Sequence, residues 1–307
     1  MSMTFYVKNK KKLFGYAAVL SVAEALQVLP DLSFFNFDEN AEGFDKDKFM
    51  RSKLSDYACL LLGVEGLSGR GFEVGYEEIN KRYTVRIFTP STRADWQLAL
   101  AYIKNLALKL GSGIINERDE EFTAQNIEAF DYEPDINAGL ASMKTQILDG
   151  DADTLESLGV NRPAALDARI AEEIMNDVSP IDKFSEFLTR LQYLDAYSAN
   201  QMFYRDRESG EIFGAYALTE GVNTILPFLP SVDFGNIHIV KNEDVGSWKI
   251  SLLHDDENMD ILDYGAFIEH LPKEKYKFID ARYILVSALN ADEMNALVSA
   301  ANWEKRD

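Results

Sequence analysis

The chain has 307 residues, 47% of them hydrophobic and 12% aromatic, so it can bury a sizeable core without disulfides or metals. This composition excludes disorder as the main state. Its 51 acidic and 31 basic side chains give a formal net charge of −20, which disfavours nucleic acid and anionic membrane surfaces as partners and attracts a basic protein partner or a cation.

The first 30 residues carry two conflicting patterns. Lysines within residues 8–12 precede an apolar stretch at 13–23, which is the outline of a secretory signal. However, a strand-like segment stands before the lysines, and Ser21 with Glu24 forms a capping box that begins a short helix. We therefore expect no cleaved signal. The expected elements are strands at 4–7 and 13–19 and a helix after Ser21.

The sequence has one cysteine, Cys59, inside an apolar run that belongs to a predicted strand at residues 57–64. A disulfide framework is therefore impossible, which fits a reducing compartment and a cytoplasmic location. A cysteine in such a run is typical of a small buried hydrophobe, so we expect no catalytic thiolate.

The clearest local signals lie between residues 70 and 116. Two β-rich runs at 71–77 and 82–89 are joined by a short polar turn and predict a hairpin, and a returning strand is expected at 113–116. Between them, Thr92 begins a helix that Gly111 ends. Trp96 lies on the apolar stripe of this helix, so we expect it to be buried against a sheet.

The middle of the chain reads as helical. Residues 131–137 are polar and contain Pro134, and we interpret them as a domain boundary. Three helices are predicted after it, the third beginning with Ser179 and Pro180. Their ranges are 138–148, 163–176 and 180–197.

The last third returns to β structure, with a strong turn signal at residues 208–211. We expect hairpins at 202–207 with 212–218 and at 236–241 with 247–254, a helix at 261–271, a strand at 276–287 and a helix at 291–301. The predicted fold class is α+β: two mostly antiparallel sheet-plus-helix units, joined by a helical segment. The predicted domains are 1–135, 136–200 and 201–307.

A glycine cluster before the first hairpin is the one candidate site. Its spacing fails the P-loop pattern, because Phe72 and Glu73 stand where Lys and Ser or Thr are needed. A site here would bind an anion through Arg70 and the backbone of Gly69 and Gly71. The competing interpretation, which we favour, is a tight turn. Arg70 would then form an internal ion pair with one of the nearby acids, Glu65, Glu73 or Glu77.

Other motifs indicate no metal, cofactor or catalytic residue. Asp149, Asp151 and Asp153 resemble the start of a Ca²⁺ loop, but the glycine and glutamate that complete such a loop are missing. The three histidines, His238, His254 and His270, lack the paired spacing of a zinc site. The acids after His254 have the chemistry to hold a hard cation weakly, yet an exposed acidic turn is the more typical reading.

Residues 4–10 and 69–73 resemble segments of a family of uncharacterised bacterial proteins of about this length. The resemblance implies a bacterial cytoplasmic origin and no particular activity. We therefore expect a non-enzymatic binding or protein-interaction protein whose acidic surface suits a basic protein partner. The alternative is a hydrolase of carboxylate chemistry with a divalent cation. The oligomeric state stays open.

Overall fold

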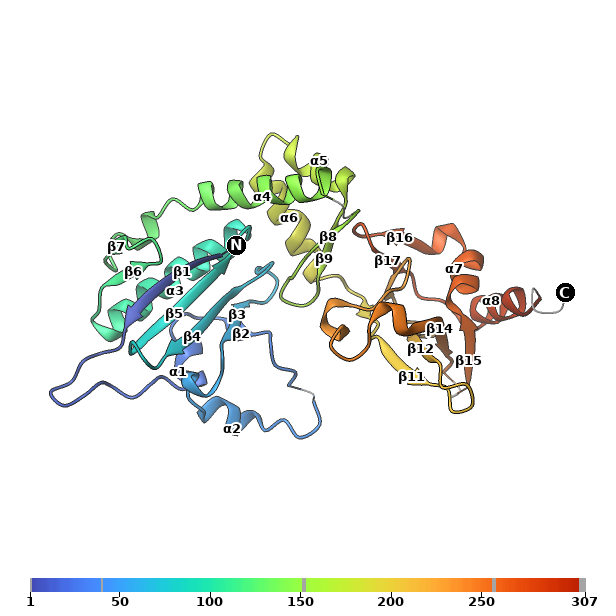
Figure 1. The fold of residues 1–307 in the computed structure, drawn as a ribbon, viewed down its shortest axis with the longest axis horizontal. Helices are drawn as coiled ribbons and strands as arrows, with labels where there is room; N and C mark the ends of the chain where they lie inside the picture. The colour runs from blue at the N-terminus through green and yellow to red at the C-terminus, as the bar shows by residue number, and fades with distance from the viewer. Residues whose placement is uncertain (1, 40, 151–152, 256–257, 304–307) are drawn as a thin grey trace. The chain divides into compact units, whose positions relative to one another are not determined.

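A computed structural model describes residues 2–39, 41–150, 153–255 and 258–303, and its fold is α+β as predicted (Figure 1). The chain divides into two compact units, Met1–Leu194 and Asp195–Asp307. Each is described by itself. In the described part of the chain, no helix is long and apolar enough to cross a membrane.

The first unit is built on a seven-stranded antiparallel sheet with the order β2-β3-β4-β5-β1-β6-β7. The predicted hairpin is confirmed as β4 and β5, and the first strand, β1, lies in the sheet interior between β5 and β6. The strands are β1 Ser2–Lys8, β2 Leu32–Phe34, β3 Leu60–Val64, β4 Phe72–Glu77, β5 Arg82–Phe88, β6 Ile114–Asn116 and β7 Glu121–Phe122.

One face of this sheet is covered by α3, Arg93–Leu110, which packs across β1 and β5 (Figure 1). The helix begins and ends as predicted: the Thr92 side chain accepts a hydrogen bond from Asp95 N, and Gly111 adopts a left-handed conformation with φ of 62°. Trp96 is fully buried, stacked between the rings of Phe130 and Tyr132. Its predicted burial is confirmed.

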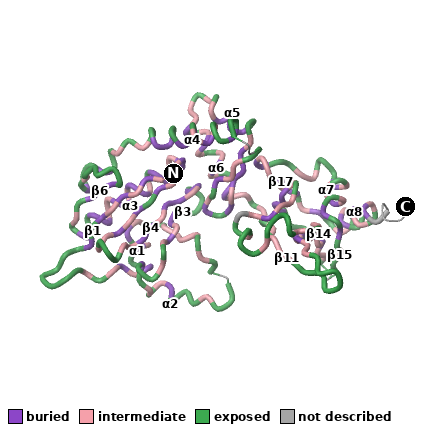
Figure 2. The backbone as a smooth tube through the Cα atoms, viewed as in Figure 1, coloured by how far each residue is buried: buried purple, intermediate pink, exposed green. Residues whose placement is uncertain are grey.

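The segment after β1 differs from the prediction. Residues 13–19 form no strand, because they extend beyond the sheet, where no neighbouring strand pairs with them. Leu13 and Phe14 are 92% and 90% exposed. A bridge between Lys11 and Tyr16 closes the loop, which is largely exposed (Figure 2). The helix α1, Val22–Leu26, then begins with the predicted Ser21 capping box. A second short helix, α2, covers Lys46–Arg51.

A helical segment completes the first unit. Its helices α4, α5 and α6 pack on one another, and β8 and β9 form a small hairpin between α4 and α5. A helix begins at Glu133, inside the polar stretch that predicts a boundary. The helix predicted at 163–176 is wrong in its first part, because Asp167 caps a later start. The bounds are α4 Glu133–Leu148, β8 Leu155–Ser157, β9 Ala164–Leu166, α5 Ala168–Met175 and α6 Pro180–Gln192.

The second unit contains two four-stranded sheets with the orders β10-β13-β17-β16 and β11-β12-β14-β15. Most pairs are antiparallel, but β12 pairs parallel with β14, and β10 pairs parallel with β13. The strands are β10 Tyr197–Ser198, β11 Met202–Arg205, β12 Ile212–Thr219, β13 Thr224–Pro227, β14 Val245–Leu253, β15 Met259–Asp263, β16 Tyr276–Phe278 and β17 Tyr283–Val286.

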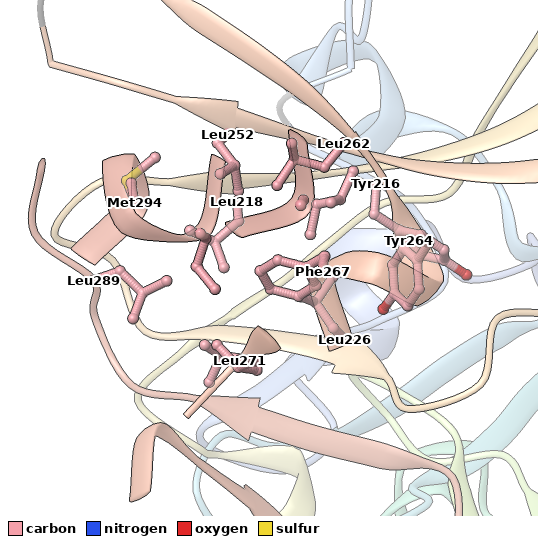
Figure 3. Close-up of a cluster of buried hydrophobic side chains, with 14 of the residues drawn as sticks. Tyr216, Leu218, Leu226, Leu252, Leu262, Tyr264, Phe267, Leu271, Leu289 and Met294 are labelled. Carbon is pink, nitrogen blue, oxygen red and sulfur yellow. The ribbon is translucent and has the colours of Figure 1, made fainter. Parts of the chain in front are cut away.

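The core of this unit lies between the two sheets and the helices α7, Tyr264–His270, and α8, Ala291–Trp303. Figure 3 shows Phe267 of α7 among side chains from both sheets, including Leu218 of β12 and Leu226 of β13. Phe267 is fully buried. Apolar residues of both sheets and both helices therefore form one core.

Three predictions in this unit are wrong. The single strand expected at 276–287 is instead a pair of strands, β16 and β17, which pair antiparallel with each other. Residues 236–241 form no strand, because both edges of β14 are occupied, by β12 on one side and β15 on the other. The helix expected from residue 261 begins only at Tyr264, since the Asp263 side chain caps it by accepting a hydrogen bond from Ala266 N at 3.0 Å. The hairpin β11–β12 is confirmed.

Candidate functional site

The glycine cluster binds an anion that belongs to the protein itself. Asp95, on the first turn of α3, is fully buried, and its carboxylate accepts hydrogen bonds from Arg70 N at 2.8 Å and Gly71 N at 3.0 Å. The hydroxyl of Thr92 donates to it as well, at 2.7 Å. Burial raises the pKa of Asp95, against the effect of these hydrogen bonds. Of the two glycines predicted to cradle a ligand, Gly71 therefore already donates its N–H to Asp95, whereas the backbone oxygen of Gly69 accepts a hydrogen bond from Val160 N at 3.0 Å.

Gly71 is required at this turn for two reasons. Its φ of 65° lies in the left-handed region, and a Cβ would collide with the backbone oxygen of Leu62. The interpretation of the glycine cluster as a tight turn is therefore correct for its backbone.

The side chain of Arg70 does not form the predicted ion pair. Its Nε donates to Leu158 O at 2.8 Å and its Nη1 to Pro90 O at 2.6 Å, and its Cζ lies 4.7 Å from the centre of the Phe88 ring. Among the residues that the structure describes, no carboxylate is within ion-pair distance of the guanidinium. Burial lowers the pKa of Arg70 to about 10, so it stays protonated at neutral pH.

The local sequence misleads because two of the three nearby acids, Glu73 and Glu77, have other partners. Glu73 lies opposite Arg86 in the β4–β5 ladder and pairs with it at 2.7 Å. Glu77 pairs with Arg82 in the same ladder. Strand pairing therefore places these carboxylates in ion pairs with basic residues of β5. Arg70 instead donates its hydrogen bonds to backbone carbonyls.

Arg70 lines a cavity of about 200 Å³, which we call the Arg70 cavity. Its walls come from the turn after β5, from α4 and from β8. The helix α4 approaches the turn closely at Gly139, where a Cβ would lie 2.5 Å from Pro90 N. The other lining residues are Thr89, Ser142, Met143, Gln146, Leu155, Glu156 and Ser157.

The second unit contains a larger cavity, of about 580 Å³, which we call the His254 cavity. It forms where β12 and β14 end: these strands are parallel, so the residues that follow them, Glu220 and His254, meet at one edge of the sheet. Asp260 of β15 and Asn295 of α8 complete its polar wall. The remaining lining residues are Asp255, Asn258, Met259 and Ala291.

His254 is held between two carboxylates in this cavity. Its Nε2 lies 3.0 Å from Asp260 Oδ2 and its Nδ1 lies 3.8 Å from Glu220 Oε2. The side chain of His254 is 9% exposed and that of Glu220 is 16% exposed, so the pair lies inside the wall of the cavity. In the acidic turn expected after His254, Asp255 is exposed as predicted, whereas His254 itself is largely buried. Asp256 and Glu257 lie outside the described residues.

No sequence pattern pointed to Glu220, which is 34 positions from His254 along the chain. Only the parallel pairing of β12 with β14 brings the two together, and parallel pairing leaves no short-range trace in a sequence. The histidines His238 and His270 do not join this site.

In the described ranges, no group of three or more His, Cys, Asp or Glu side chains is placed to hold a metal ion. Asp151 of the Ca²⁺-like stretch lies outside these ranges. Cys59 is half-buried, and burial raises the pKa of its thiol, which disfavours the thiolate.

Residues 2–297 match a family described as a domain of unknown function, DUF4299. The match covers nearly the whole chain, so the predicted membership of a full-length family of uncharacterised proteins is confirmed. No curated protein and no solved structure matches the chain.

Proposed function

For this chain, which belongs to the DUF4299 family, we propose a non-enzymatic binding function in which the His254 cavity holds a basic group of a protein partner. The observation that carries the proposal is the charge of the cavity wall. Glu220, Asp255 and Asp260 line it, and no lysine or arginine is among the lining residues that the structure describes.

The geometry favours a cationic group over a neutral one. Glu220 is largely buried, and its carboxylate accepts a hydrogen bond from Asp255 N at 3.3 Å. Its other neighbour, the Nδ1 of His254, is 3.8 Å away, which is beyond a normal hydrogen bond. A carboxylate that is largely buried and has only weak hydrogen bonds to offset its lost hydration attracts an ammonium or guanidinium.

The size of the cavity fits a side chain. At about 580 Å³ it falls within the range of pockets that enclose organic ligands, so it can admit a whole lysine or arginine side chain. The net charge of −20 adds long-range attraction for a basic partner and repels nucleic acid and anionic membranes. The proposal includes a cytoplasmic location. The single cysteine supports it, because a chain without disulfides suits a reducing compartment.

Calorimetric titration with a short peptide of alternating lysine and glycine tests the proposal. We expect saturable binding that weakens as salt is raised, because charge attraction is screened. Glu220→Gln should weaken binding by about tenfold, equivalent to about 1.4 kcal/mol. Glu269→Gln is the matched control, since Glu269 is exposed on α7 and does not line the cavity.

Two results would contradict the proposal. One is equal binding of the same peptide with glutamate in place of lysine. The other is equal affinity of the Glu220→Gln and Glu269→Gln variants for the lysine peptide.

A hydrolase is the second candidate, and the 3.0 Å contact between His254 Nε2 and Asp260 favours it. A carboxylate in this position orients an imidazole that acts as a general base. No serine, threonine or cysteine is among the described lining residues, so the base would activate water. Turnover of small esters or peptides that His254→Asn abolishes, with lysine-peptide binding retained, would establish hydrolysis in place of binding alone.

A further inference from the structure

Two polar groups at the Arg70 cavity lack partners within the described residues. The Nη2 of Arg70 has none, while the Nε and Nη1 of the same guanidinium donate to backbone carbonyls. The hydroxyl of Ser157 also has no hydrogen-bond partner, although Ser157 is only 6% exposed. Buried donors are almost always satisfied in folded proteins, so the buried Ser157 hydroxyl indicates a missing acceptor, and the Nη2 of Arg70 is the nitrogen of the guanidinium that is open to a ligand.

We propose that the Arg70 cavity is a second ligand site, which binds a small monocarboxylate. The carboxylate accepts hydrogen bonds from the guanidinium of Arg70 and the hydroxyl of Ser157. Ser142 offers a further donor: its Oγ accepts from Gln146 Nε2 at 3.0 Å and so keeps its own proton for another acceptor.

The guanidinium is fixed before the ligand arrives. The carbonyl oxygens of Leu158 and Pro90 hold two of its nitrogens, and the ring of Phe88 lies 4.7 Å from its Cζ. An arginine that is already ordered loses little side-chain entropy on binding. Its positive charge has no direct ion pair in the described part of the chain, so an anionic ligand supplies the counter-charge.

Two features of the cavity define the ligand class. Glu156 lines the same cavity, and its carboxylate repels anions. This repulsion is stronger for a dianion such as phosphate than for a monoanion. Pro90, Met143 and Leu155 give the cavity apolar walls, and its volume is about 200 Å³. A carboxylate with a short aliphatic body matches both the charge and the walls.

This mode of binding differs from the one that the glycine spacing suggests. The N–H groups of Arg70 and Gly71 donate to Asp95, so the backbone turn serves to position the arginine and does not contact the ligand. The site also shares no lining residue with the His254 cavity, where the described charged lining residues are three carboxylates and a histidine.

Chemical-shift titration of the ¹⁵N-labelled full chain with butyrate tests the proposal, with butyramide as the neutral analogue and inorganic phosphate as the dianion. We expect butyrate to shift the amides of α4 and β8 in a saturable way and butyramide to leave them unchanged. Arg70→Gln should weaken butyrate binding by about tenfold or more, because charge-assisted hydrogen bonds are the strong ones.

The control and the second variant keep the test decisive. Arg86→Gln should leave butyrate affinity unchanged, because Arg86 is near the same Phe88 ring but is paired with Glu73 and does not line the cavity. Ser157→Ala should weaken binding by about threefold and leave the fold intact, because it removes a buried hydroxyl that has no partner. It therefore decides the matter if Arg70→Gln fails to fold.

Three outcomes would overturn the proposal: no saturable shift with butyrate, equal binding of butyramide, or equal affinity for phosphate. Unchanged butyrate affinity in the Ser157→Ala variant and in a folded Arg70→Gln variant would do the same.

Discussion

The two cavities differ in the charged residues that line them and are built in different ways. In the first unit, one arginine is held by backbone carbonyls from two distant segments of the chain. In the second unit, the charge comes from side chains that follow the ends of two parallel strands. A net charge of −20 therefore describes the chain as a whole and not its sites, because the structure places an arginine in the wall of a cavity of an acidic protein, with no direct ion pair in the described part of the chain. The predictions below test whether the two regions differ as described.

The largest effect is expected from Phe267→Ala. Phe267 is fully buried at the centre of the second unit's core, and truncating such a side chain costs about 3–5 kcal/mol. Hydrogen exchange should show weaker protection of β12, β14 and β17, with the protection of β1 and β5 in the first unit unchanged. Equal loss of protection in both units would show that they do not unfold separately.

Asp95→Ala should destabilise the first unit by about 2–4 kcal/mol, since it leaves the buried N–H groups of Arg70 and Gly71 without an acceptor. Hydrogen exchange of β4 and α3 would measure the loss. Asp45→Ala is the control, because Asp45 caps only the short α2 and its removal costs about 1 kcal/mol. Equal losses of stability in the two variants would mean that Asp95 contributes no more than a side chain at the start of a helix does.

Gly139→Ala should destabilise the first unit by about 1–2 kcal/mol, because the new Cβ would lie 2.5 Å from Pro90 N and push α4 away from the turn. Thermal unfolding measures the change, and Ser142→Ala on the same helix is the control. A stabilised Gly139→Ala protein would show that α4 moves freely over the turn, which contradicts a preformed Arg70 cavity.

Butyrate affinity should stay constant from about pH 6 to about pH 9, because a guanidinium keeps its charge throughout that range. Burial lowers the pKa of Arg70 to about 10, so the affinity should fall as the pH rises through that value and the charge is lost. The same lowered pKa means that the folded state releases this proton before the unfolded state does, so burial of the charge costs stability below about pH 10 and this cost falls as the pH rises above that value. A marked fall in affinity below pH 9 would indicate that another group carries the charge.

Chelation is expected to have no effect. The melting temperature should be the same with and without EDTA, because paired cysteine and histidine spacing is missing from the sequence. A drop of several degrees in either unit would show a structural metal.

Local signals predicted the local structure. The capping side chain of Thr92 and the glycine at 111 set both ends of α3, and the apolar stripe placed Trp96 in the core. The sites could not be predicted in the same way. The contacts of Arg70 with Leu158 and of His254 with Glu220 join residues 88 and 34 positions apart, and both depend on which strands become neighbours. Sequence proximity instead suggested Glu73 as an ion-pair partner of Arg70. The strand register places Glu73 opposite Arg86, and the two form an ion pair.

The loop between β1 and α1 has a practical consequence for handling the protein. Lys10, Lys11 and Lys12 are exposed there, next to Leu13 and Phe14, so trypsin would cut at this point before it reaches the sheet. Because β1 is hydrogen-bonded to β5 on one side and to β6 on the other, residues 2–8 would remain bound after the cut. The nicked molecule would migrate as two pieces in denaturing gels and as one in native gels. A synthetic β1 peptide added to a chain that lacks it would then restore the sheet.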